Sequence, residues 1–141
     1  MSLWNDENVR AWLRQAWQDS RPGTNDAREQ GGFVLQDADG FLSVERWPRG
    51  EQDRIVVPPH MGGRRTGKRI VATFHTHPNA GDEYEQEPSL TDIRAVRDDP
   101  DLQHAEYEGE LVIATENLYR IRPDGSVEIA ERTDDFLLGG V

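Results

Sequence analysis

Apolar residues near the N-terminus recur at the spacing of a helix. They fall three or four positions apart, with polar residues between them, and Asn5 or Asp6 can cap the first turn. This pattern predicts an amphipathic helix over residues 6–18 that packs its apolar face on a core. The apolar positions are Val9, Trp12, Leu13, Ala16 and Trp17.

Short runs typical of β-strands follow this helix. Two of them, 32–36 and 41–47, flank the turn Asp37-Ala-Asp-Gly40 and predict a hairpin. A second helix is expected from Ser89 to the Arg97-Asp-Asp-Pro100 stop. The order of elements predicts a mixed α/β fold with a largely antiparallel sheet flanked by helices. Its other strands are expected over 54–57, 69–74, 111–115, 118–122 and 127–131.

Two histidines lie at the end of the most apolar of these strands. The strand runs into Phe74-His-Thr-His77 and then meets the turn signal Pro78-Asn-Ala-Gly. Side chains two apart on a strand point to the same face, so His75 and His77 are expected to project together. A pair of neighbouring imidazoles suits a divalent transition metal, above all zinc.

The start of the second helix offers a carboxylate to the same place. Ser89 with Asp92 three residues later has the form of a capping box, with Asp in place of Glu or Gln. If this helix packs on the sheet, its N-terminus can face the histidine pair. Asp92 would then be a third zinc ligand, which leaves one coordination position for water. His60 is a weak candidate for a fourth ligand.

These motifs resemble those of a known family. His75-Thr-His-Pro78 followed by Ser89-Leu-Thr-Asp92 is similar to the JAMM motif (MPN+ or JAB domain) of zinc isopeptidases. That motif also has an upstream glutamate near a glycine, and Glu29-Gln-Gly-Gly fits it. The resemblance covers about residues 27–130. It implies an MPN/JAB-like fold that binds one zinc ion per chain.

The resemblance also implies a role for each residue of the motif. His75, His77 and Asp92 would hold zinc, Glu29 would act as general base and then as acid, and Ser89 would donate a hydrogen bond to the developing oxyanion. One departure lies between the two halves of the motif, where the gap is longer than usual in the family. The extra residues are acidic, namely Asp82, Glu83, Glu85 and Glu87.

Several alternatives remain open at this point. Glu45 and Glu51 are the other glutamates upstream of the histidines, although Glu45 is expected to face solvent or pair with an arginine and Glu51 to lie in a loop. A non-catalytic JAB-fold interaction module is the second functional hypothesis. Other metal hydrolases that begin with His-x-His need more histidine and aspartate ligands than the chain supplies.

Composition narrows the choice of partners. The chain carries a formal net charge of −11, which disfavours nucleic acid and suits a protein or peptide substrate. The resemblance adds a ubiquitin-like Gly-Gly tail as one such substrate. Cysteine is absent, so no thiolate can hold a metal. We expect no membrane partner, because no apolar run approaches about 20 residues. With no signal peptide apparent, a cytoplasmic location is the default expectation.

The length of 141 residues suits a single domain over 1–141. Two segments keep open interpretations. The basic, glycine-rich loop 58–68 is either a substrate-edge loop or a solvated one, since it lacks phosphate-loop spacing. The tail 132–141 ends in Gly-Gly-Val and is expected to dock its apolar residues on the core or to stay ragged. The oligomeric state is left open.

Overall fold

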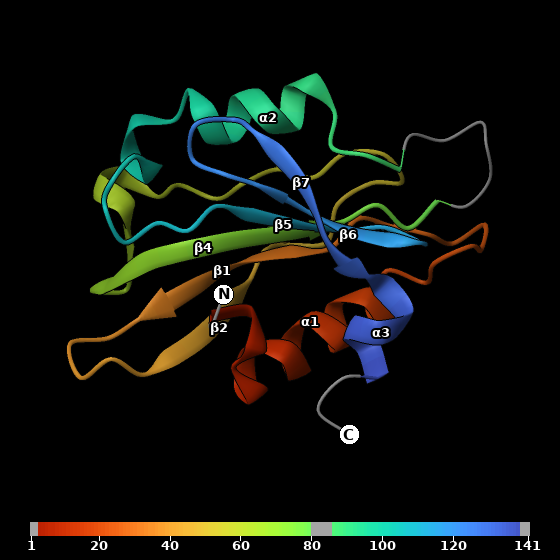
Figure 1. Cartoon of the computed structure of the whole chain (residues 1–141), viewed down its shortest axis with the longest axis horizontal. Coiled ribbons are helices and arrows are strands. Elements are labelled where there is room, and N and C mark those ends of the chain that lie inside the picture. Colours follow the sequence, from red (N-terminus) through yellow and green to blue (C-terminus); the bar gives the residue numbers. More distant parts are fainter. Residues whose placement is uncertain (1–2, 80–85, 139–141) are drawn as a thin grey trace.

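A seven-stranded sheet forms the centre of the protein (Figure 1). The computed structural model describes residues 3–79 and 86–138. Within these residues the strand order is β2-β1-β4-β5-β6-β7, and β3 pairs with β4 outside this path. The strands are β1 (Gly31–Gln36), β2 (Leu42–Arg46), β3 (Arg64–Arg65), β4 (Lys68–Thr76), β5 (Glu110–Ile113), β6 (Asn117–Ile121) and β7 (Val127–Arg132).

The described strands pair antiparallel except at one junction. β4 and β5 are parallel neighbours. Because parallel strands need a crossover connection, the chain between them leaves the sheet and forms helix α2 (Leu90–Arg97) and the 3-10 turn η3 (Pro100–Leu102). The prediction of a mixed α/β fold with a largely antiparallel sheet and flanking helices is confirmed at this level.

The helices divide between the two faces of the sheet (Figure 1). Helices α1 (Glu7–Asp19) and α3 (Thr133–Leu138) lie on one face, and α2 lies on the other. Asp6 caps α1 as predicted, since its side chain accepts a hydrogen bond from the backbone N–H of Val9. Short 3-10 turns, η1 (Leu3–Asn5) and η2 (Met61–Gly63), complete the helical elements of the described chain. None of these helices has the length and apolar character needed to span a membrane.

Strand β4 presents different side chains to the two layers. Its register with β1 shifts at Val71, because Val34 pairs with Ala72 whereas Leu35 pairs with Ile70. Beyond this bulge, Phe74 packs in the apolar cluster under α1. The alternating residues, among them His75, face the α2 layer. The bulge therefore sets which face of β4 carries polar side chains at the strand end.

One predicted strand is wrong. The segment 54–57 has no strand structure, and Ile55, Val56 and Val57 make no backbone–backbone hydrogen bond within the described part of the chain. Its β-branched residues favour extended backbone, but a strand also needs a partner. Val56 is largely exposed, and the segment forms a wall of the cavity described below.

The beginning of the predicted tail docks on the core as a helix, which the sequence pattern did not indicate. The Thr133 hydroxyl, at the start of α3, donates a hydrogen bond to the carbonyl of Ala114, just after β5. Phe136 is only 1% exposed. The guanidinium of Arg10 lies 4.2 Å from the centre of the Phe136 ring and donates to its carbonyl. The last three residues, 139–141, lie outside the described residues.

We predict that Phe136→Ala lowers the free energy of unfolding by about 3–5 kcal/mol, because it removes a fully buried aromatic side chain. Chemical denaturation followed by circular dichroism measures the change. The exposed neighbour Asp135 supplies the control, and Asp135→Ala should change the unfolding free energy by less than about 0.5 kcal/mol. Equal stability of the two variants would show that α3 does not contribute to the core.

Candidate metal centre

His75 occupies a fixed place near the end of β4. It pairs in register with Gly31 on β1 and with Val112 on β5, and the residue is only 4% exposed. Only glycine fits at position 31, which lies opposite His75 on β1. A Cβ added at Gly31 would lie 2.4 Å from the Trp47 ring and 2.8 Å from the carbonyl of Phe74. The glycines after Glu29 thus permit the close backbone approach that their sequence position predicted.

His77 follows directly after β4 and stays attached to the sheet. Its backbone N–H donates to the carbonyl of Ile113 over 2.8 Å, which continues the parallel pairing with β5. The Nε2 atoms of His75 and His77 lie 3.1 Å apart, and the ring centres are 5.0 Å apart. The two imidazoles therefore converge, as the spacing of two residues predicted.

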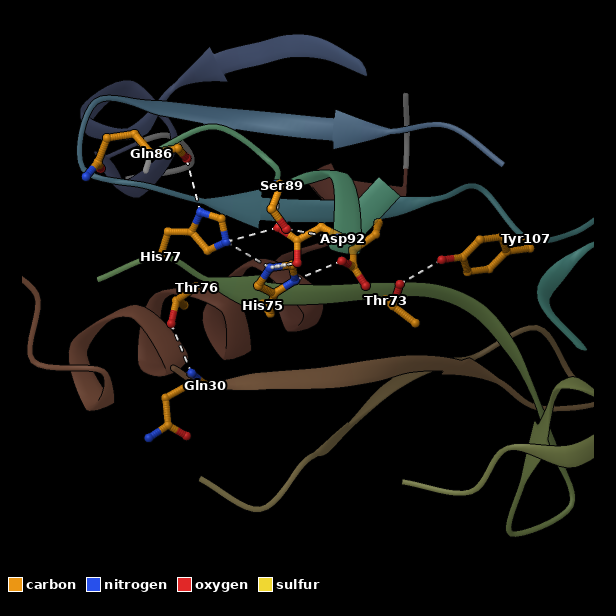
Figure 2. Close-up of polar contacts among 10 residues, drawn as sticks. Gln30, Thr73, His75, Thr76, His77, Gln86, Ser89, Asp92 and Tyr107 are labelled. Atoms are coloured by element: carbon orange, nitrogen blue, oxygen red, sulfur yellow. Dashed lines mark hydrogen bonds and ion pairs between the residues drawn. The ribbon is translucent and has the colours of Figure 1, made fainter. Parts of the chain in front are cut away.

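Asp92 approaches both imidazoles from the first turn of α2 (Figure 2). Its Oδ1 lies 3.5 Å from Nε2 of His75, and its Oδ2 lies 3.3 Å from Nε2 of His77. Four donors placed about 2.0–2.1 Å from zinc at the corners of a tetrahedron lie about 3.4 Å apart. The separation of the two Nε2 atoms, 3.1 Å, and that of Nε2 of His75 from Oδ1 of Asp92, 3.5 Å, are close to this edge length, and Asp92 presents its second oxygen to His77 at 3.3 Å.

A capping box fixes Asp92 in this position. Its backbone N–H donates to Oγ of Ser89 over 3.0 Å, and its Oδ2 accepts the backbone N–H of Ser89 over 2.8 Å. Both bonds of the predicted box are present. The same pair of hydrogen bonds that starts the helix therefore directs the carboxylate toward the imidazoles.

Both histidines have their outer ring nitrogen engaged. Nδ1 of His77 lies 3.2 Å from the carbonyl oxygen of Gln86 (Figure 2). Nδ1 of His75 lies 2.8 Å from Oε2 of Glu110. These oxygens accept, so each Nδ1 carries a proton, and each neutral ring then has its lone pair on Nε2. Outer-shell acceptors of this kind orient metal-binding histidines and raise their basicity.

The centre consequently brings electron-rich atoms together. Two Nε2 lone pairs and a carboxylate face one another at distances that repel unless a cation, either a proton or a metal ion, lies among them. Burial would raise the pKa of the Asp92 carboxyl, but the contacts with His75 and His77 hold that pKa below its usual value. Burial would lower the pKa of His75, but Glu110 and Asp92 raise it well above the usual value.

Glu29 lies beside this group without touching it. One of its carboxylate oxygens lies within 4.8 Å of a ring nitrogen of each histidine. Its backbone is held by hydrogen bonds to the 50–51 loop, and its carboxylate has no hydrogen-bond partner among the described residues. Burial raises the pKa of Glu29 to about 7, against the opposing effect of the two histidines. Asp92, which makes the closer contacts, fits a ligand better, and Glu29 fits a group that exchanges protons.

A single cavity joins all five predicted residues. It has a volume of about 530 Å³ and is lined by Glu29, His75, His77, Ser89 and Asp92, together with Glu110. Trp47, Ile55 and Val57 add an apolar wall. The Ser89 hydroxyl accepts the Asp92 N–H, which leaves its own O–H to donate into this space.

No protein-family model, curated protein or solved structure matches the chain.

The other candidates lie apart from this centre. Glu45 pairs with Arg65 and Glu51 with Arg54, in agreement with their predicted surface roles. His60 contacts Asp99 and not His75 or His77. Of the acidic residues in the long gap, Glu87 is exposed, and Asp82, Glu83 and Glu85 lie outside the described residues.

Glu110 is the residue that sequence reasoning missed. It is 6% exposed and starts β5, where it pairs in register with Thr73 two positions before His75. The available signal was an acidic residue at the start of an apolar strand. That signal has no meaning until the parallel pairing of β4 with β5 is known, because only this pairing brings Glu110 under the histidine.

We predict that Glu110→Ala weakens zinc binding about 10- to 100-fold, because His75 loses the acceptor that orients its ring. Competition with a chelating dye measures the affinity. Glu110→Gln keeps an acceptor oxygen and should recover part of the loss. The exposed Glu116 supplies the control, and Glu116→Ala should bind zinc like the wild type. Unchanged affinity in Glu110→Ala would contradict the positioning role.

Proposed function

We propose that this protein is a zinc-dependent hydrolase that cleaves an amide bond in a protein or peptide. The observation that carries the proposal is the convergence of the Nε2 atoms of His75 and His77 with the Asp92 carboxylate, whose two oxygens each lie 3.3–3.5 Å from one Nε2. Two histidines and one carboxylate are a ligand set typical of catalytic zinc, which keeps one position for water. Glu29 and Ser89, which line the same cavity, support hydrolysis in particular.

The three ligands would hold one zinc ion per chain. Bound at such a site, zinc makes water nucleophilic near neutral pH and polarises a carbonyl group. Neighbouring residues orient the three proposed ligands toward the position of the ion. The Glu110 carboxylate and the Gln86 carbonyl keep the Nε2 atoms of the histidines directed inward, and the Ser89 N–H orients Asp92.

Glu29 is suited to take a proton from the attacking water. Its carboxylate is close to the imidazoles, has no competing partner in the described chain and has a pKa raised to about 7 by burial. A base with a pKa near the working pH transfers protons most effectively, and the gain is typically about 10²–10⁴-fold. After bond cleavage the same group, now protonated, can give its proton to the leaving amine.

Ser89 is suited to stabilise the oxyanion that develops on the carbonyl. Its hydroxyl oxygen is occupied by the N–H of Asp92, so the O–H is free to turn into the cavity. One well-aimed donor of this kind contributes about 3–4 kcal/mol to the transition state. This hydroxyl lies one helical turn from the carboxylate ligand, so positioning one residue also positions the other.

The likeness to JAMM isopeptidases is part of the proposal. Support comes from the central histidine strand, the helix that follows it with a capping box, and Glu29 before the neighbouring strand. We accordingly propose an MPN/JAB-like fold and, as one substrate class, bonds that follow a ubiquitin-like Gly-Gly tail. A non-catalytic interaction module would not need an unpartnered Glu29 beside an intact ligand set.

The first test is the zinc content. After dialysis against metal-free buffer, the wild type should keep close to one zinc per chain, because the three ligands are nearly preorganised. His77→Ala and Asp92→Asn should lose it, whereas Glu29→Gln should keep it. Elemental analysis of each purified protein measures the ratio. A wild type that keeps no zinc, or a Glu29→Gln variant that loses it, would refute the assignment of ligands.

The second test is activity on peptides and on Gly-Gly-linked fusions. Glu29→Gln should slow cleavage about 10²–10⁴-fold while zinc stays bound. The wild-type rate should fall as the pH drops below the pKa of Glu29, because the base must be ionised. Since zinc lowers that pKa, the fall should begin at or below about pH 7. Equal rates for the wild type and the zinc-loaded Glu29→Gln variant would exclude Glu29 as the base.

A further inference from the structure

A second group of metal-binding side chains lies beyond the other end of α2. His60, Asp99 and Asp101 each offer one ligand atom, and these atoms all lie within 4.8 Å of one another. His60 belongs to the loop that continues from the apolar wall of the cavity, and the two aspartates belong to the turn after α2. The group is half-buried, with side-chain exposures of 17% for His60 and 19% for Asp99.

The ring of His60 has the same arrangement as the two histidines of the first centre. Its Nδ1 lies 2.8 Å from the carbonyl oxygen of Pro58, which can only accept, so Nδ1 carries a proton. The Nε2 atom, which bears the lone pair of the neutral ring, faces Oδ2 of Asp99 at 2.5 Å. Two electron-rich atoms at this distance need a cation between them or beside them.

Each aspartate uses one oxygen for the fold and keeps the other. Oδ1 of Asp99 accepts the backbone N–H of Asp101, which caps η3, and Oδ1 of Asp101 accepts the backbone N–H of Gly62. These bonds fix both carboxylates. Oδ2 of Asp99 faces His60, and Oδ2 of Asp101 has no hydrogen-bond partner among the described residues. Two anchored carboxylates with unused oxygens are arranged as ligands are in metal sites.

The loop that carries His60 is held in one conformation. Gly62 and Gly63 have φ values of 72° and 68°, in the left-handed region that favours glycine. A Cβ added at Gly63 would lie 2.5 Å from the carbonyl oxygen of Asp101, so the loop and the turn pack without room for a side chain. The Gly63 N–H also donates to the carbonyl of His60. The donors on the two segments therefore start close to their final positions.

The local electrostatic field also favours a positive charge. The group lies just after the C-terminal end of α2, where the helix dipole is negative. Burial lowers the pKa of His60, but the Pro58 carbonyl and the two carboxylates raise it overall. No arginine of the described chain forms an ion pair with Asp99 or Asp101, so direct contact with arginine does not cancel this field.

We propose that His60, Asp99 and Asp101 form a second site for a divalent transition-metal ion, with zinc the best match to one imidazole and two carboxylates. This site is independent of the proposed hydrolytic centre. Donors around zinc lie about 3.4 Å apart, so binding of zinc requires Nε2 of His60 and Oδ2 of Asp99 to separate by about 1 Å. A bound ion would join the loop behind the cavity wall to the end of α2.

Zinc titration of the chelator-treated protein tests this site, using isothermal titration calorimetry and elemental analysis after equilibrium dialysis. The wild type should take up about two zinc ions per chain in micromolar free zinc, and His77→Ala about one. His60→Ala should also take up one, and the double variant none. Asp101→Asn should weaken the second site about 10-fold or more, because it removes a charged ligand. The exposed Glu116 supplies the control, and Glu116→Ala should keep both ions.

Each alternative result has a definite meaning. If His77→Ala binds no zinc throughout the micromolar range, His60 and Asp99 form a proton-mediated ion pair and the second site does not exist. If calcium or magnesium binds with the affinity of zinc and His60→Ala does not weaken it, the site is made by carboxylates alone and the proposal is also overturned. Failure of the hydrolytic centre would appear separately, as loss of the zinc that remains in His60→Ala.

Discussion

The organisation of this protein depends on the convergence of three electron-rich groups, which repel one another unless a cation lies among them. Nε2 of His75, Nε2 of His77 and the Asp92 carboxylate lie 3.1–3.5 Å apart. Such an arrangement stores repulsion unless positive charge is present. The fold positions these groups through the Glu110 carboxylate and the Gln86 carbonyl, which engage the outer ring nitrogens of the histidines, and through the Ser89 N–H, which binds Oδ2 of Asp92.

The topology explains how distant residues meet. Among the described strands, β4 and β5 form the single parallel pair. This pair requires a crossover, and α2 within that crossover returns its N-terminus to the end of β4. β5 then starts with Glu110 directly under the histidine strand. Antiparallel β1 comes from the other side and brings Glu29 in just before its first residue. The proposed ligands, base and orienting acid thus derive from four segments that one strand, β4, organises.

Local sequence rules predicted much of this site, but they could not predict contacts that depend on pairing between distant strands. Alternation along a strand predicted the convergence of His75 and His77, and capping chemistry predicted the box of Ser89 and Asp92. Both depend on residues within four positions of each other. Glu110 could not be found in this way, because its role arises from register between strands. The segment 54–57 failed for a related reason, since β-branched composition cannot reveal whether a partner strand is present.

Helix α2 shows why polar contacts matter so much here. Val96 is its only fully buried residue, so apolar packing alone holds it weakly against the sheet. Its first turn is fixed by the capping box and by the contacts of Asp92 with the histidines. Its other end leads into Asp99, which contacts His60 on the loop behind the cavity wall. A cation that binds the folded arrangement and not the unfolded chain stabilises it in proportion to its occupancy. Cations bound at the two proposed sites would therefore hold both ends of this lightly packed helix more firmly in place.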